Sequence, residues 1–202
     1  MSAAPPGRSP VVLVAAAGDA EGSLAAAAAL ACAGSVGDPA PLLVDVEGRA
    51  ARPTLLASAA AQRLERRLGA HLPGVRPVAR GQLCQLVVAA EPEGLIAAAA
   101  AVTVARGAPA VVHVGQPRFR DLLEAAEAPS PTAVLLRADV RSDRALLGLL
   151  VPELRERGLA VAVLKRRLGW VAERRALFGA LPLGAAALPG RLVARLLGEG
   201  AT

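Results

Sequence analysis

The residues whose types and spacing could do chemistry gather first near the start of the chain. An apolar run over residues 11–17 leads into a glycine-containing turn, and an alanine-rich stretch follows. The turn and its flanks comprise Gly18, Asp19, Ala20, Glu21, Gly22, Ser23 and Leu24. A strand that enters a helix through such a turn presents backbone N–H groups that can hold an anion. The segment therefore has the shape of a phosphate-binding loop.

The side chains that such a loop normally supplies are missing. The pattern G-x-x-x-x-G-K-[ST] places a lysine on the β- and γ-phosphates and a hydroxyl on Mg²⁺. Ser23 follows Gly22 where the lysine is expected, and Leu24 replaces the hydroxyl. Asp19 and Glu21 add negative charge, which repels phosphate. These departures favour a loop without phosphoryl-transfer chemistry, and a plain strand-to-helix turn capped by Ser23 is the structural alternative.

Two carboxylates and a histidine near the ends of later apolar runs are further candidates. Asp45 and Glu47 could contact a metal ion or act as switch residues, or they could be loop acids paired with nearby arginines. His113 could be a general base or a ligand, but a packed, hydrogen-bonded histidine is the favoured interpretation. The spacing of serine, histidine, aspartate and cysteine indicates no catalytic arrangement. No cluster of metal ligands is predicted.

Composition restricts the class of protein. The 202 residues suffice for one domain with a substantial core. The net charge is +6, yet no basic run carries interleaved aromatic residues, so no specific nucleic-acid interface is predicted. The densest basic stretch, 165–175, could contact an anion or a partner, or form a solvated surface. Cys32 and Cys84 fit no metal spacing and are expected to be buried thiols in a reducing cytosol.

The elements that must position these residues follow from hydrophobic patterning. Strands are predicted over residues 11–17, 42–46, 83–89, 110–114, 133–136, 160–164 and 181–186. Helices are predicted over residues 22–33, 54–68, 93–106, 119–128, 142–157, 171–178 and 191–197. Strands that alternate with helices predict a three-layer α/β/α fold around a mostly parallel sheet of about seven strands, of P-loop NTPase or Rossmann type.

The domain organisation is simple. A single α/β domain is expected over residues 11–202, after a disordered lead over residues 1–10. Residues 71–82 are the longest irregular stretch. Residues 188–197 combine leucines with two arginines and could be a basic amphipathic tail on an anionic membrane surface, or a last helix docked on the sheet. No uncharged apolar run reaches transmembrane length.

Four landmarks, in chain order, resemble the ParA/MinD family of P-loop NTPases, of the SIMIBI class. They are the strand–loop–helix over 11–31, the strand Leu-Leu-Val-Asp-Val over 42–46, the strand Ala-Val-Val-His-Val over 110–114, and the strand over 131–136 followed by 155–167. Residues 86–94 are similar to the strand and turn of the CpaE-like branch, which works in Flp/Tad pilus assembly. The resemblance spans nearly the whole chain through element order rather than through one motif.

The departures from the family fall on its chemistry. The resemblance puts Asp45, Glu47 and His113 at switch and Walker B positions, and Lys165 at the position of an adenine-reading asparagine. It implies ATP or ADP as cofactor, but the missing lysine, hydroxyl and aspartate argue against both. The expected protein is therefore a degenerate, cytoplasmic family member without ATP hydrolysis. It would act by binding or positioning partners in pilus assembly or secretion, and could form a homodimer.

Two other functions fit parts of the sequence. Gly18 and Gly22, with Asp45 further on, loosely match a dinucleotide-binding fingerprint, which favours a Rossmann-type enzyme; the glycine spacing differs from G-x-G-x-x-G. A divergent but active ATPase could instead borrow a cation across a dimer. Lys165 is the only lysine in the chain and would be its source.

Overall fold

The computed structural model describes residues 9–18, 20–34, 39–46, 56–88, 93–117, 119–127, 130–138, 144–165, 188 and 190–197. The strand predicted over 181–186, the helix predicted over 171–178 and most of the predicted N-terminal lead lie outside the described residues.

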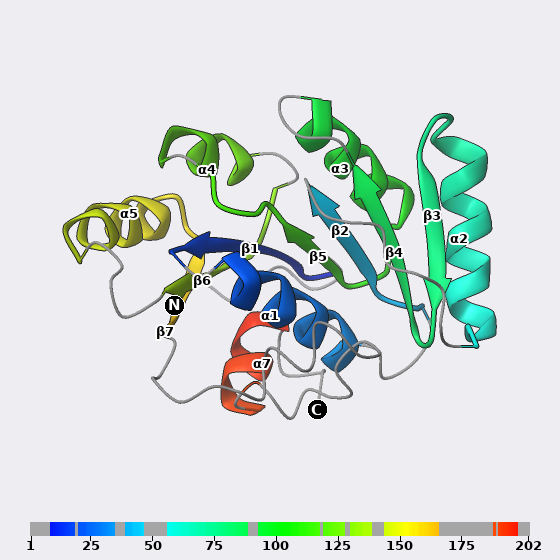
Figure 1. The fold of residues 1–202 in the computed structure, drawn as a ribbon, viewed down its shortest axis with the longest axis horizontal. Coiled ribbons are helices and arrows are strands. Elements are labelled where there is room, and N and C mark those ends of the chain that lie inside the picture. Colours follow the sequence, from blue (N-terminus) through cyan, green and yellow to red (C-terminus); the bar gives the residue numbers. More distant parts are fainter. Residues whose placement is uncertain are drawn as a thin grey trace.

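A seven-stranded sheet forms the centre of the molecule, in the order β3-β4-β2-β5-β1-β6-β7 (Figure 1). Its strands are β1 (Val11–Ala17), β2 (Leu42–Val46), β3 (Arg76–Arg80), β4 (Leu83–Val88), β5 (Ala110–His113), β6 (Ala133–Ala138) and β7 (Ala160–Lys165). All neighbouring pairs are parallel except β3 with β4. The inner strands are buried along their length because helices cover both faces, which explains their continuous apolar sequences. The predicted α/β fold with its mostly parallel sheet is confirmed.

The edge strand β3 corrects the prediction of an irregular segment over 71–82. Its sequence, Arg-Pro-Val-Ala-Arg, contains a proline and begins and ends with charged residues, so it lacks the apolar run of the inner strands. Proline is tolerated here because β3 is an edge strand, with one side free of a ladder. Gly81, at φ +56°, makes the tight turn that lets β4 run back antiparallel to β3.

Helices cover the sheet in two layers with separate apolar cores (Figure 1). On one face lie α1 (Ala20–Ala33) and α7 (Gly190–Leu197). On the other lie α2 (Ala59–His71), α3 (Glu93–Val104), α4 (Phe119–Ala125) and α5 (Arg144–Glu156). The helix predicted to begin at residue 54 begins later, because Ser58 is its N-cap: the Ala61 N–H donates to Ser58 Oγ over 3.1 Å. These layers are the predicted α/β/α arrangement.

The C-terminal helix α7 uses its apolar face inside the molecule. Val193, Leu196 and Leu197 are buried in the same core as α1, whereas Arg191 and Arg195 are exposed. The docked alternative for residues 188–197 is therefore the one observed, since a membrane-bound helix would need that apolar face for lipid. Within the described residues, no helix is both long and apolar enough to cross a bilayer.

Candidate functional site

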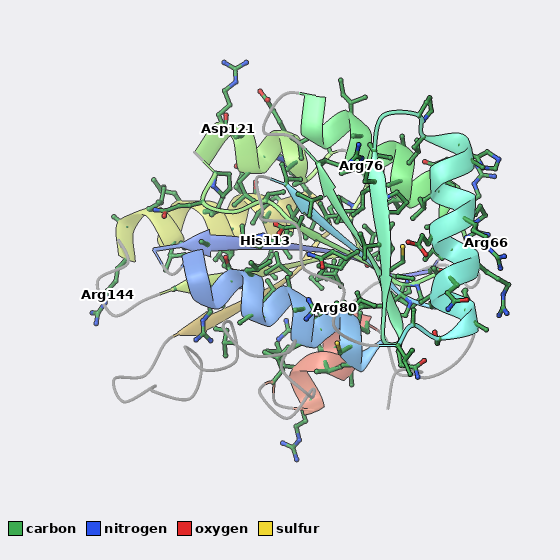
Figure 2. The ribbon with its side chains drawn as sticks, turned by 45° about the vertical axis from the view of Figure 1, so that its right-hand side comes forward. Arg66, Arg76, Arg80, His113, Asp121 and Arg144 are labelled. Atoms are coloured by element: carbon green, nitrogen blue, oxygen red, sulfur yellow. The ribbon has the colours of Figure 1, made fainter. Side chains whose placement is uncertain are left out.

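The strand register brings Asp45 and His113 side by side. Asp45, on β2, is the registered partner of His113, the last residue of β5, and His113 is in turn the partner of Val14 on β1. Side chains alternate between the two faces of a strand. Val14 belongs to the core beneath α1, so this row of side chains faces α1. Figure 2 shows His113 well inside the molecule, whereas Arg66 and Arg144 point outward.

Helix α1 completes this row with a hydroxyl. Ser23 lies in its first turn, and its Oγ is 2.8 Å from His113 Nε2. The other ring nitrogen, His113 Nδ1, is 2.8 Å from Asp45 Oδ1. Ser23 and Asp45 have no exposed surface, and His113 is 5% exposed. Three residues widely separated along the chain thus form one buried Ser–His–Asp hydrogen-bond chain. The spacing of these residues along the chain did not indicate this arrangement, because the three lie 90 and 68 positions apart.

The partners fix the direction of the two hydrogen bonds. A carboxylate can only accept, so the Nδ1–H of His113 donates to Asp45 Oδ1. In the neutral imidazole the other nitrogen then accepts, and the Ser23 hydroxyl donates to Nε2. This tautomer can take a proton from Ser23. Protonation of the ring would instead create a buried ion pair with Asp45.

One oxygen of the site lacks a hydrogen bond. Asp45 Oδ2 is buried and has no partner among the described residues. A carboxylate oxygen could coordinate a metal ion, but the described residues include no group of three or more histidine, cysteine, aspartate or glutamate side chains that could hold one. A hydroxyl and a carboxylate on the two nitrogens of one imidazole are an arrangement that suits proton transfer.

The loop residues take separate positions around this chain. Gly18 is exposed at φ +104°, a backbone conformation that glycine adopts without strain, and it forms a bridge to Ala138. Gly22 is buried beside Ser23, and Leu24 is half-buried. Asp19 and Glu47 lie outside the described residues. Ala20 and Glu21 open α1 and Lys165 ends β7, but their side chains lie outside what the structure describes.

A buried arginine near the loop escaped the sequence analysis. Arg137 is 2% exposed on β6 and is registered opposite Ala16 on β1. By alternation it faces the same side of the sheet as Ser23. Its position inside an apolar strand, Ala-Val-Leu-Leu-Arg-Ala, was a usable signal, because a charged residue within a buried strand is rarely tolerated without a partner. The site edge thus carries a buried cation as well as the Ser–His–Asp chain.

Comparison with solved structures identifies the fold. A ParA family ATPase from Chlorobium tepidum TLS superimposes with a TM-score of 0.52 at 12% sequence identity, over 95% of this chain and 81% of that chain. The chain has a ParA-like P-loop fold. A chain of the MinC:MinD cell division protein complex from Aquifex aeolicus superimposes with a TM-score of 0.47 at 14% identity, over 93% of this chain and 77% of that chain. No protein-family model and no curated protein matches the sequence.

Within the ParA-like fold, the hydrogen-bond chain lies at the carboxyl ends of the parallel strands. In open α/β sheets, ligands bind at the carboxyl ends of the strands, next to helix N-termini. Ser23 lies in such a helix start, and His113 and Asp45 lie at or next to the last residues of two central strands. Three of the predicted site residues therefore meet at one point.

Proposed function

We propose that this protein is a degenerate ParA/MinD/CpaE-like P-loop protein that has lost ATP hydrolysis and acts by binding protein partners. The observation that supports it is the Ser23–His113–Asp45 chain. Lysine, metal-binding hydroxyl and aspartate neutralise the charge that develops on transferring phosphate. Here the residues at the lysine and aspartate positions, Ser23 and His113, bond to each other, and His113 also bonds to Asp45. None of these three side chains is exposed enough to meet a triphosphate.

The first test is a calorimetric titration of ATP and ADP, with and without Mg²⁺, followed by a turnover assay. The expected result is neither saturable heat nor phosphate release above background, because no cationic side chain follows Gly22 to meet the β- and γ-phosphates. ATP turnover that disappears in an Asp45→Ala variant would contradict the proposal and favour the divergent ATPase. In that case, ATP-dependent dimerisation lost in Lys165→Ala would identify the borrowed cation.

A second test rebuilds the missing groups. The triple variant Ser23→Lys, Leu24→Thr, His113→Asp restores a lysine, a hydroxyl and an aspartate at their positions, and we expect it to gain Mg²⁺-dependent ATP binding. The matched control, Ser23→Ala, Leu24→Thr, His113→Ala, breaks the same hydrogen bonds and adds the hydroxyl, but it adds neither the lysine nor the aspartate. Binding by both variants, or by neither, would show that these substitutions are not what silences the site.

Exposed apolar side chains support a protein partner. Within the described residues, Leu146 and Leu149 on α5 and Val163 on β7 are 40%, 69% and 38% exposed. Contiguous exposed apolar groups mark protein contacts, and Leu146 and Leu149 lie three positions apart on α5, which puts them on the same side of that helix. From the resemblance of residues 86–94 to the CpaE-like branch, we propose pilus assembly or secretion as the process in which such a partner acts. A homodimer is the second proposed form of association. The docked position of α7 favours protein over membrane.

The Rossmann-type enzyme is the alternative that the same edge of the sheet could serve. A thermal shift with NADH or NADPH, and none with ATP, would favour it over the partner-binding protein. The described geometry offers it little, because Asp45, which would hold a ribose hydroxyl, is buried and bonded to His113.

A further inference from the structure

The Ser–His–Asp chain has the connectivity that activates a serine nucleophile. Ser23 Oγ and Asp45 Oδ1 each lie 2.8 Å from a different nitrogen of the same ring. General-base catalysis needs both contacts: the first lets the ring take the hydroxyl proton, and the second holds the ring in the required tautomer. A packed structural histidine needs satisfied nitrogens, but it does not need a serine on one and a carboxylate on the other.

The position of Ser23 in the fold fits the same chemistry. It lies in the first turn of α1, which follows the central strand β1 across the turn at Gly18. A strand–turn–helix unit also carries the serine of α/β-hydrolases. The start of a helix is the positive end of its dipole, and so favours negative charge that develops on a substrate oxygen. The consecutive strands β5 and β6 lie on opposite sides of β1, so the strand order reverses at β1. Open α/β sheets bind their ligands at such a reversal.

We propose that Ser23 is the nucleophile of an acyl-transfer site for small, uncharged carboxylic esters, with His113 as general base and Asp45 as the positioning residue. This activity goes beyond the partner-binding function and does not depend on it. Ser23 is fully buried and the His113 side chain is 6% exposed, which restricts the proposed substrates to compact acyl groups. The carboxylate of Asp45 disfavours anionic substrates.

The reaction balances without a cofactor. The Ser23 oxygen attacks the ester carbonyl carbon while His113 Nε2 accepts the hydroxyl proton. The tetrahedral intermediate collapses, the bond from the carbonyl carbon to the alcohol oxygen breaks, and His113 returns the proton to the departing alcohol. Water then attacks the acyl-serine by the same route, with His113 again taking and returning the proton. The sum is ester plus water giving acid plus alcohol.

Two small electrophiles test the proposal on the full chain: p-nitrophenyl acetate and diisopropyl fluorophosphate. We expect each to modify Ser23, identified by peptide mass mapping of the wild-type protein, so that the result does not depend on a folded Ser23→Ala variant. His113→Gln should slow the modification by at least about 10²-fold, the lower end for general-base catalysis. Ser130→Ala is the matched control, because Ser130 is an exposed serine bonded to a backbone carbonyl, and it should change nothing.

A pH profile separates activation from mere accessibility. The wild-type rate should fall in acid, where the imidazole is protonated and can no longer accept the hydroxyl proton, and Asp45→Asn should lower the rate because the ring loses its orienting acceptor. His113→Gln should lose the acid limb. Modification at Ser130 or Ser58 in place of Ser23, an unmodified Ser23, or an unchanged rate in His113→Gln would overturn the proposal. ATP hydrolysis by the protein would contradict the partner-binding function but would leave these outcomes unaffected.

Discussion

Two regions of the sheet bury polar side chains, and they differ in how these are satisfied. At the carboxyl end of the central strands, Ser23, His113 and Asp45 bond to one another, and Asp45 Oδ2 is the one oxygen of the three side chains without a partner among the described residues. Toward the β3 edge, Gln85 on β4 is 6% exposed, and its Oε1 has no hydrogen-bond partner among the described residues. Matched partners offset the desolvation of buried polar groups, and an unmatched group leaves that penalty uncompensated. Loss of a polar side chain should therefore have opposite effects in the two regions.

The largest effect is expected for His113→Ala. The variant leaves Ser23 Oγ and Asp45 Oδ1 buried without the ring that joined them, which should lower the free energy of unfolding by about 3 kcal/mol. Urea denaturation measures the difference. His71→Ala is the control: His71 is exposed on α2 and bonds only to the Arg67 carbonyl, so its loss should cost roughly 0.5 kcal/mol or less. Equal losses would remove the distinction between the hydrogen-bond chain and an ordinary surface contact.

An intermediate effect concerns pH and Cys84, which precedes Gln85 on β4. Burial raises the pKa of the Cys84 thiol from 9.0 to about 12, with a smaller contribution from the Glu65 carboxylate. Above pH 9 the unfolded chain releases this proton and the folded chain keeps it, so stability is complete below pH 9 and falls as pH rises toward 12. The loss is about 1.4 kcal/mol per pH unit within that window.

Urea unfolding at pH 8 and at pH 10 measures this loss, and Cys84→Ala should remove it. An alkaline loss that persists unchanged in Cys84→Ala would show that other groups cause it. Cys32 offers an internal comparison, because burial also raises the pKa of its thiol while the nearby charge of Arg80 lowers it. It is only partly buried, so a soluble disulfide reagent should reach Cys32 before Cys84.

The smallest effect, and the one of opposite sign, is expected for Gln85→Leu. A leucine of similar volume removes the unmatched amide oxygen from the α1 side of the sheet, and should raise the free energy of unfolding by about 0.5–1 kcal/mol. Gln62→Leu on the exposed surface of α2 is the control and should be close to neutral. Destabilisation by Gln85→Leu would mean that Gln85 has a hydrogen-bond partner. The two regions would then not differ in how their buried polar groups are satisfied.

The sequence predicted the sheet well wherever burial on both faces imposes one pattern. The predicted bounds of the first two strands, 11–17 and 42–46, are those observed. Strand β3 was missed because an edge strand needs no apolar run, and its ladder with β4 is a tertiary contact that local pattern does not encode. The start of α2 was misplaced because Ser58, rather than the preceding apolar residues, determines where the helix begins.

The site was predicted as separate residues and not as a chain of contacts. Ser23, Asp45 and His113 were each identified, but Ser23 and His113 are 90 positions apart and His113 and Asp45 are 68 apart. No local spacing reports such a contact. Asp45 and His113 can be paired only once β2 and β5 are known to be neighbours in the sheet. The chain order does not reveal this, because β2 and β5 are not consecutive strands.

The central place of β1 has a consequence for how the protein is made. This strand is synthesised before the other six strands of the sheet, yet its registered partners lie on β5 and β6, with Val12 opposite Val111 and Ala133. At ordinary translation speeds of about 5–20 residues per second, the nascent β1 waits on the order of ten seconds for its neighbours. Throughout that interval a β-branched apolar segment is unpaired. We therefore expect the yield of the protein to be more sensitive to translation rate than its final stability is.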